Sequence, residues 1–275
     1  MSKIRSVEEL AELIPDGAHV AIPPEYSFVP MELVHQLIRR KARDLRLLCV
    51  PLGGMAVDLL IGAGCVAEIE AAAVSLAENG PAPRFTDAAI TRKIKIIDST
   101  CPAVHTALQA AEKGVPFMPL GGIIGSDIEA HRSDWRTVDD PLGQGNGPII
   151  LIPAIQPEFA IIHSPLADQF GNVWIGRRRE LVTMAHAAKR TLVTAEQIIE
   201  GDLLDDEKTA AGSLPALYVS ALAKAKYGAK PLALTDCYER DGAAIADYAR
   251  QAKTDAGFDD YLMQHVYSGR ASAAE

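Results

Sequence analysis

The chain has 275 residues, 48% of them hydrophobic, and a formal net charge of −9. It can therefore bury a sizeable core, and it lacks the excess of Lys and Arg that a nucleic-acid surface needs. Its four cysteines show no CxxC spacing, which argues against a metal site. No apolar run reaches the roughly 18 residues of a membrane span, and no signal peptide is evident. We expect a cytoplasmic, reduced protein that binds neither nucleic acid nor membranes.

The first half of the chain alternates between helical and strand patterns. Ser6 and Glu9 form a capping-box signature at the start of a short helix. Hydrophobic spacing and turn residues then predict, in chain order, a strand at 18–22, a helix at about 30–40, a strand at 45–50, a helix at 57–62 and a strand at 66–74. Alternation of this kind is typical of parallel strands joined by right-handed crossovers.

The stretch from Ile94 to Asp127 reads as strand, loop, helix, strand and glycine-rich turn. Ser99, Thr100 and Cys101 follow the first of these strands, and Thr100 and its neighbours offer capping oxygens just ahead of a proline. Ligands in open α/β sheets bind outside the carboxyl ends of strands. We therefore place Ser99, Thr100 and Cys101 at a functional site.

The second half of the chain is less regular. Residues 128–147 are polar and aperiodic and predict an insertion or mobile loop. Short strands are expected at 149–153, 159–163, 173–175 and 190–194, with a helix at 181–188, and the pattern becomes helical and Ala-rich from about residue 201. The whole chain predicts a single α/β domain spanning 1–275, a three-layer α/β/α sandwich with a mostly parallel sheet.

Four motifs, taken in their order along the chain, carry a family resemblance. They are Gly53-Gly54, AENGPAPRF at 77–85, GVPFMP at 114–119 and ADQFGNVWIG at 167–176. Over most of residues 1–200 the chain resembles the α-subunit half of the family I coenzyme A transferases. That group includes the glutaconate and 3-oxoacid types and a branch of CoA-ester ring hydrolases.

This resemblance implies an activity that needs two kinds of chain. In such transferases CoA moves between carboxylic acids through a glutamyl-CoA thioester formed on a partner β subunit. The chain would then be the α subunit of a heterodimer or heterotetramer. It would act on an acyl-CoA and a carboxylic acid, with a coenzyme A thioester as substrate and no permanently bound cofactor.

Glu78 is the first catalytic candidate. The tetrapeptide Ala77-Glu78-Asn79-Gly80 imitates the Ser-Glu-Asn-Gly motif of the β-subunit nucleophile, but it follows the third predicted strand. The β-type motif would follow the second strand, where this chain has Pro51-Leu52-Gly53-Gly54. A pocket or interface role for Glu78, with Asn79 beside it, is therefore favoured over a nucleophilic one, and a plain polar turn is the alternative.

Cys101 is the second catalytic candidate. By the resemblance, it occupies the position where ketoacid-type α subunits carry Gln and ring-opening hydrolase subunits carry an acid. A thiol at a helix N-terminus gains nucleophilicity from the helix dipole. An unpaired cysteine is also commonly a small buried apolar residue, and both interpretations stay open at this point.

The first strand-to-helix turn departs from the family pattern. The usual glycine-rich segment is replaced by Pro23-Pro24-Glu25-Tyr26, and proline has no N–H to donate. Glu25 and Tyr26 bring an acid and a hydroxyl to the strand end instead, which suits an altered substrate or reaction. We expect substrate and CoA to be bound by one cluster at the strand ends, formed by Glu25, Tyr26, Gly53, Gly54, Asn79, Ser99, Thr100, Gly121 and Gly122.

Other features allow more than one interpretation. The triplet Arg177 to Arg179 is either a solvated loop or a phosphate contact for CoA. His163 is expected to support the turn from Asp168 to Asn172. Two further functions also fit the pattern: a CoA-thioester hydrolase of the ring-cleaving type, and a non-catalytic phosphosugar-binding module of the same fold.

Overall fold

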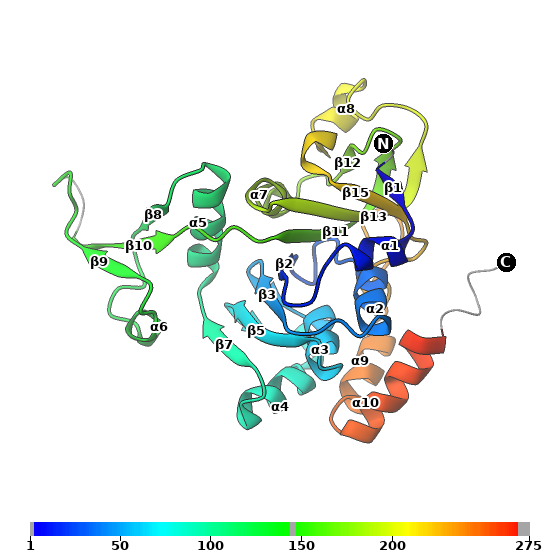
Figure 1. Ribbon diagram of the computed structural model, residues 1–275, viewed down its shortest axis with the longest axis horizontal. Helices are drawn as coiled ribbons and strands as arrows, with labels where there is room; N and C mark the ends of the chain where they lie inside the picture. Colours follow the sequence, from blue (N-terminus) through cyan, green and yellow to red (C-terminus); the bar gives the residue numbers. More distant parts are fainter. Residues whose placement is uncertain (1–2, 144–146, 269–275) are drawn as a thin grey trace.

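The computed structural model describes residues 3–143 and 147–268, and its centre is a mostly parallel sheet with helices on both sides (Figure 1). The main path of the sheet runs in the spatial order β1, β15, β13, β11, β2, β3, β5, β7, and every neighbouring pair along it is parallel. These strands are β1 (Ile4–Arg5), β2 (His19–Ile22), β3 (Leu45–Cys49), β5 (Val66–Ala71), β7 (Lys95–Asp98), β11 (Phe159–Asp168), β13 (Arg190–Ile199) and β15 (Ala221–Lys224). The predicted α/β sandwich is confirmed.

Side chains alternate across the sheet and form one hydrophobic core on each face. In β2, for example, Val20 and Ile22 join the core on one face, and Ala21 joins the core on the other. The first core is covered by α1 (Val7–Glu12), α2 (Met31–Arg39), α3 (Met55–Gly62), α4 (Pro83–Thr91), α9 (Gly242–Gln251), α10 (Asp255–Tyr261) and the π-helical turn η3 (Leu262–Tyr267). The second is covered by α5 (Cys101–Glu112) and α7 (Arg179–Ala187).

A separate antiparallel sheet projects from the side of the molecule (Figure 1). It contains β8 (Phe117–Leu120), β10 (Ile149–Pro153) and β9 (Arg136–Val138), with the short helix α6 (Asp127–His131) between β8 and β9. The prediction that residues 128–147 lack regular structure is wrong for α6 and β9, while 144–146 lie outside the described residues. β8 follows α5 but does not join the main sheet, because Trp135, Ile150 and Ile152 form a small core against α5.

The prediction of a helical C-terminal part from about residue 201 is wrong up to residue 241. This stretch holds α8 (Glu207–Ala210), β14 (Ser213–Leu214), the 3₁₀ turn η2 (Ala216–Tyr218) and β15. β15 lies inside the main sheet between β1 and β13. Its alanines favour helix locally, but Ala221 and Ala223 pack into one core and Leu222 into the other. Helices resume only at α9.

Short elements complete the strand ends. β4 (Leu52–Gly53) pairs with β6 (Ala73–Val74), the 3₁₀ turn η1 (Ala77–Asn79) follows β6, and β12 (Val173–Trp174) pairs with β11 and β14. The turn between β11 and β12 is held by Asp168, whose Oδ1 accepts backbone N–H groups of Phe170, Gly171 and Asn172, each at 2.9 Å. This turn is therefore structural.

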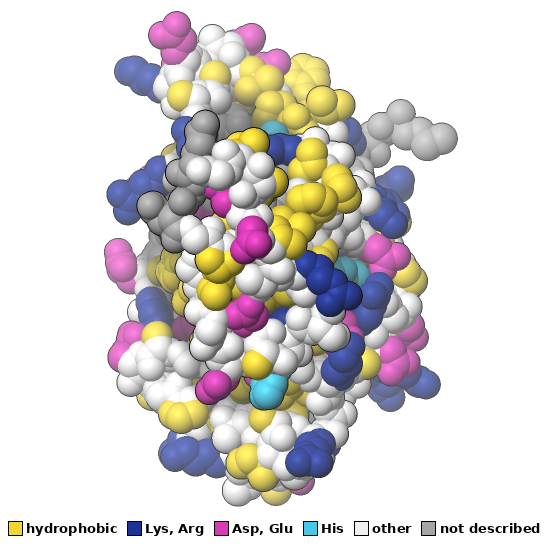
Figure 2. Space-filling view, turned by 90° about the vertical axis from the view of Figure 1, so that its left-hand side faces the viewer, with side chains coloured by type: hydrophobic (Ala, Val, Ile, Leu, Met, Phe, Trp, Pro, Cys, Tyr) yellow, Lys and Arg dark blue, Asp and Glu magenta, His cyan; other side chains and the backbone are white. Residues whose placement is uncertain are grey.

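The surface beside the small sheet is rich in hydrophobic side chains. Figure 2 shows yellow side chains gathered on this side of the molecule, next to dark blue Lys and Arg. The exposed large hydrophobic residues between α5 and β10 are Val115, Phe117, Ile124, Val138 and Leu142. Over the described residues, every helix is too short or too polar to cross a membrane.

Candidate functional site

A largely buried carboxylate lies where β2 ends. Glu25 follows Pro23 and Pro24, and its Oε2 accepts the backbone N–H of Met55 at 3.1 Å, at the N-terminus of α3. A Cβ atom on Gly54 would lie 2.0 Å from this oxygen, so the carboxylate fits only because residue 54 is glycine. Burial raises the pKa of Glu25, and the Met55 N–H opposes that rise. The structure thus brings together two predicted groups, Glu25 and Gly54.

Arg240 joins Glu25 to Glu78. Its Nη2 lies 3.4 Å from Glu25 Oε1, and its Nη1 donates to Glu78 Oε1. Nη2 also lies 3.5 Å from the carbonyl oxygen of Leu76. Sequence reasoning missed Arg240, because it stands in a stretch without a motif, 162 positions from Glu78 along the chain. A lone arginine two residues before a helix gives no local signal of its partners.

Cys101 is exposed and is the first residue of α5. Thr100 is the N-cap, and its Oγ1 accepts the N–H of Ala103 at 3.2 Å, as the sequence predicts. Exposure rules out the interpretation of Cys101 as a buried apolar residue. Tyr26 is 62% exposed, and its pKa is raised by partial burial and further by the charges of Glu180 and Cys101. Tyr26 and Cys101 therefore lie within electrostatic range of each other.

Polar side chains at the start of α7 lie beside the residues that follow β2. Ser27 donates from its hydroxyl to Glu180, and Arg178 Nη1 lies 3.5 Å from the same hydroxyl. The Arg178 guanidinium stacks on the Phe28 ring at 4.5 Å. The middle arginine of the triplet is therefore held in place and is not part of a solvated loop.

The remaining predicted residues divide into two groups. Ser99 is buried beside the strand ends, where its N–H donates to Ala71 O at 3.1 Å, and Gly53 packs so tightly that a Cβ would lie 2.9 Å from Cys49 Sγ. Gly121 and Gly122 follow β8 in the small sheet, and a Cβ on either would meet no atom within 4 Å. The reason for expecting them at this site is wrong, because β8 belongs to the small sheet and not to the main one. Leu120 and Ile123, which flank these glycines, pack against the small core that includes Ala103 near the start of α5, so the convergence of Gly121 and Gly122 with the other groups stays a prediction.

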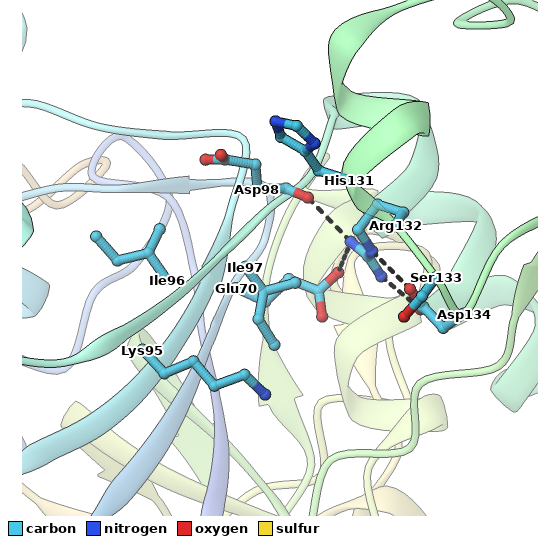
Figure 3. A pocket seen from close by; sticks show the side chains of 9 residues that line it. All are labelled: Glu70, Lys95, Ile96, Ile97, Asp98, His131, Arg132, Ser133 and Asp134. Atoms are coloured by element: carbon cyan, nitrogen blue, oxygen red, sulfur yellow. Dashed lines mark hydrogen bonds and ion pairs between the residues drawn. The ribbon is translucent and has the colours of Figure 1, made fainter. Parts of the chain in front are cut away.

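A cavity of about 470 Å³ lies between the ends of β5 and β7 and the segment after α6 (Figure 3). Arg132 Nη1 donates to Glu70 Oε1 at 2.8 Å and to the carbonyl of Asp98 at 3.1 Å, while Nη2 donates to Asp134 at 2.8 Å. The guanidinium also lies 4.4 Å from the Trp135 ring centroid. Arg132 is thus fully engaged, and it anchors the small sheet to the strand ends.

His163 has a different partner from the predicted one. Its Nδ1 lies 2.8 Å from Thr194 Oγ1 and its Nε2 lies 3.0 Å from Glu196 Oε1, so it does not support the Asp168 turn. Adjacent parallel strands place His163 opposite Thr194, a register that sequence pattern cannot supply. Burial lowers the pKa of His163.

The site combines an acid of raised pKa, an exposed thiol, a hydroxyl and an arginine at the carboxyl ends of parallel strands. Such a set can bind and orient a polar acyl substrate at a helix N-terminus. Among residues 3–143 and 147–268, no three His, Cys, Asp or Glu side chains are placed to hold a metal ion.

Comparison with known sequences decides the family. The chain matches the family described as Coenzyme A transferase over residues 4–225. It belongs to the coenzyme A transferase family. Within this family, the A subunit of glutaconate CoA-transferase from Acidaminococcus fermentans is 27% identical, with 97% of this chain and 88% of that protein covered. The A subunit of 3-oxoadipate CoA-transferase from Pseudomonas knackmussii is 28% identical, with 95% and 94% covered.

Other relatives extend the range of this coenzyme A transferase fold. An uncharacterized protein from Archaeoglobus fulgidus is 31% identical over 96% of this chain, which spans only 59% of that protein's length. The cholesterol ring-cleaving hydrolase IpdA subunit of Rhodococcus jostii is 28% identical, with 86% and 82% covered. The crystal structure of glutaconate CoA-transferase from A. fermentans superposes with a TM-score of 0.87, covering 99% of this chain and 93% of that one at 24% identity. A variant of the decarboxylase AibA/AibB gives 0.83, with 96% and 100% covered at 27% identity.

Proposed function

We propose that this chain is the α subunit of a heteromeric coenzyme A transferase that moves CoA from one carboxylic acid to another. Family membership supports the reaction class, and two relatives named as A subunits of such transferases align over nearly their whole length. The substrates are an acyl-CoA thioester and a carboxylic acid.

One observation carries the assignment of the nucleophile to a partner β subunit. A carboxylate that attacks a thioester must be free to reach its carbonyl carbon. Glu25 is held by the Met55 N–H and by Arg240, so it is not free to attack. Glu78 is exposed, but it follows the third predicted strand, whereas the β-type nucleophile motif would follow the second. We therefore assign to the partner the glutamate that forms the glutamyl-CoA thioester.

This chain then supplies the surroundings of the acyl group. We infer that Glu25, Tyr26, Asn79 and the segment from Ser99 to Cys101 bind and orient the thioester at the strand ends. Gly54 allows the close approach of the Glu25 carboxylate, and Gly53 allows close packing against Cys49 and Val74. Cys101 is exposed at the first position of α5, and we infer that it contacts the substrate from there.

The exposed hydrophobic side chains of the small sheet support a second chain in the assembly. Phe117, in β8, is 45% exposed, and Leu142, in the connection between β9 and β10, is 79% exposed. Surfaces of this kind commonly mark contacts between proteins. We propose that the β subunit binds here, in a heterodimer or a heterotetramer.

A CoA-thioester hydrolase is the second candidate, favoured by Cys101. An exposed thiol stands at the N-terminus of α5, and relatives at 28% identity are named as ring-cleaving hydrolase subunits. Transfer and hydrolysis differ in the fate of the acyl group. The contacts of the described residues give no support to the phosphosugar-binding alternative.

The test begins with the assembly. The tagged chain is purified from cells that naturally produce it, and light scattering measures the mass of the complex. We expect a second chain of similar size and, after incubation with acyl-CoA, a CoA adduct on a glutamate of that chain by mass spectrometry. An active complex that contains this chain alone would contradict the proposal.

Isotope labelling separates the two reactions. In transfer, labelled CoA passes from the CoA ester of one acid into the CoA ester of a second acid. In hydrolysis, oxygen from solvent water enters the free acid and no acceptor is needed. Cys101→Ala should lower turnover and leave the fold intact, because an exposed thiol loses little packing. Unchanged kinetics would remove Cys101 from the mechanism.

A further inference from the structure

Arg240 pairs with two carboxylates, Glu78 and Glu25, that differ in their exposure to solvent. The Glu78 side chain is 69% exposed, whereas that of Glu25 is 14% exposed. Water screens an exposed pair, so the contact with Glu78 adds little to stability. Glu78 also stands in a short 3₁₀ turn, while Glu25 is fixed by the Met55 N–H. Of the two carboxylates, Glu78 is the exchangeable one.

Contacts with Glu25 and with the Leu76 carbonyl hold Arg240 in place independently of Glu78. Nη2 faces Glu25 and the Leu76 carbonyl, and Nη1 faces Glu78. If Glu78 swings away, the guanidinium keeps its position and presents Nη1 to solvent. A guanidinium fixed in this way is suited to bind a carboxylate from outside.

A second donor lies in the same turn. The side-chain nitrogen of Asn79 is buried and has no hydrogen-bond partner among the described residues. A buried donor without a partner is unfavourable, and an incoming acceptor would relieve it. Arg240 lies in the C-terminal segment, outside residues 4–225 that match the family model.

We propose that Arg240 recognises a carboxylate of the substrate other than the reacting one, and that Glu78 occupies this place until the substrate displaces it. This rests on the proposed function and deepens it by naming a substrate class, dicarboxylic acids and their CoA esters. One carboxylate enters the thioester chemistry, and the other binds Arg240. Glu78 is then a competitor of the substrate rather than a nucleophile.

The test is calorimetric titration of the purified full chain, and of its complex with the partner, with glutarate as the probe. Glu78→Gln removes the competing charge and should tighten glutarate binding about two- to fivefold, the range expected for an exposed ion pair. Arg240→Gln should weaken binding at least about tenfold, and Arg240→Lys should recover part of the loss. The uncharged analogue glutaramide should not bind.

A matched control separates local displacement from a general change in charge. Glu239 is adjacent to Arg240 in the chain, so Glu239→Gln removes the same charge nearby. If it tightens glutarate binding as much as Glu78→Gln does, the proposal is wrong. It is also overturned if Arg240→Gln binds glutarate like the wild type, or if neither the wild type nor Glu78→Gln binds it. A failure to find CoA transfer leaves these binding results standing, so the two proposals fail separately.

Discussion

The C-terminal segment contributes side chains to two polar clusters, a closed one around Glu196 and an open one around Arg240. In the closed cluster, the Glu196 carboxylate accepts the Tyr238 hydroxyl at 2.7 Å and the N–H groups of Tyr227 and Gly228 at 2.8 and 2.9 Å, beside His163. In the open cluster, Arg240 reaches the exposed carboxylate of Glu78 and the largely buried one of Glu25. Tyr238 and Arg240 are close neighbours in the sequence, yet they serve different clusters.

The difference shows how a fold combines stability with an exchangeable contact. Burial makes each unpaired group costly in the closed cluster, so all its members stay paired. Burial by itself would raise the pKa of Glu196. Hydrogen bonds from His163, Tyr238 and the Tyr227 backbone outweigh this effect and lower the pKa to about 2. The closed cluster anchors the segment from 227 onward. The open cluster can therefore change partners without unfolding that segment.

The largest effect is expected when the closed cluster is broken. Glu196→Ala leaves the Tyr238 hydroxyl and two backbone N–H groups without their acceptor. We expect a loss of about 3 kcal/mol or more in the free energy of unfolding, measured by urea denaturation. Glu200→Ala removes an exposed carboxylate just beyond the end of the same strand and should cost less than about 0.5 kcal/mol. Equal costs would show that the closed cluster is not an anchor.

A smaller effect is expected in the open cluster from Gly54→Ala. The new Cβ would lie 2.0 Å from Glu25 Oε2, so the carboxylate must leave the Met55 N–H. We expect a cost of about 1–3 kcal/mol in urea denaturation. Gly242→Ala is the control, because a Cβ there meets no atom within 4 Å and the residue begins α9. If Gly54→Ala is as mild as the control, the Glu25 carboxylate is held less tightly than its contacts indicate.

The smallest effect is a pH dependence from His163. Its folded-state pKa is lowered by burial, so below the ordinary value of 6.5 the unfolded chain binds the proton first. Stability is therefore lost as pH falls through 6.5, by at most about 1.4 kcal/mol per pH unit. Burial lowers the pKa of His19 and His105 in the same way, so the comparison with His163→Gln isolates one group.

The measurement is the melting temperature between about pH 7.5 and 5.5, the range that brackets the ordinary histidine pKa. Wild type should lose more stability over this range than His163→Gln does. Glu196 stays ionised throughout, because its pKa is about 2. Parallel curves for the two proteins would contradict a neutral, buried His163.

Much of the sheet follows from the hydrophobic pattern of the sequence. The errors at β8 and β15 have the same cause. The strands β2, β3, β7 and β11 were predictable from short apolar runs bounded by turn residues. β8 and β15 were not placed correctly, because the neighbour of a strand depends on segments far away in the chain. Pro116 precedes β8, Pro119 lies within it, and alanines make up half of β15, so local preference contradicts their final pairing.

The candidate site was predicted in part, and each part has a physical reason. Glu25, Gly54 and Cys101 follow predicted strands, and position along a parallel strand indicates which end of the sheet a residue occupies. Arg240 and the partner of His163 were missed. A charge far along the chain reveals nothing about its counterion until the segments between have packed.

By itself, the sequence determined the features that depend on neighbours within a turn or two. The capping box of Ser6 and Glu9 and the cap of Thr100 form within three residues, and the alternation of strands and helices follows from side-chain period. Only the tertiary structure decided that Arg240 meets Glu25, 215 positions away, and that β8 pairs with β10. Local hydrogen bonds are specified by spacing. Long-range ion pairs and strand register are specified by which buried surfaces fit together, and a linear pattern does not contain that information.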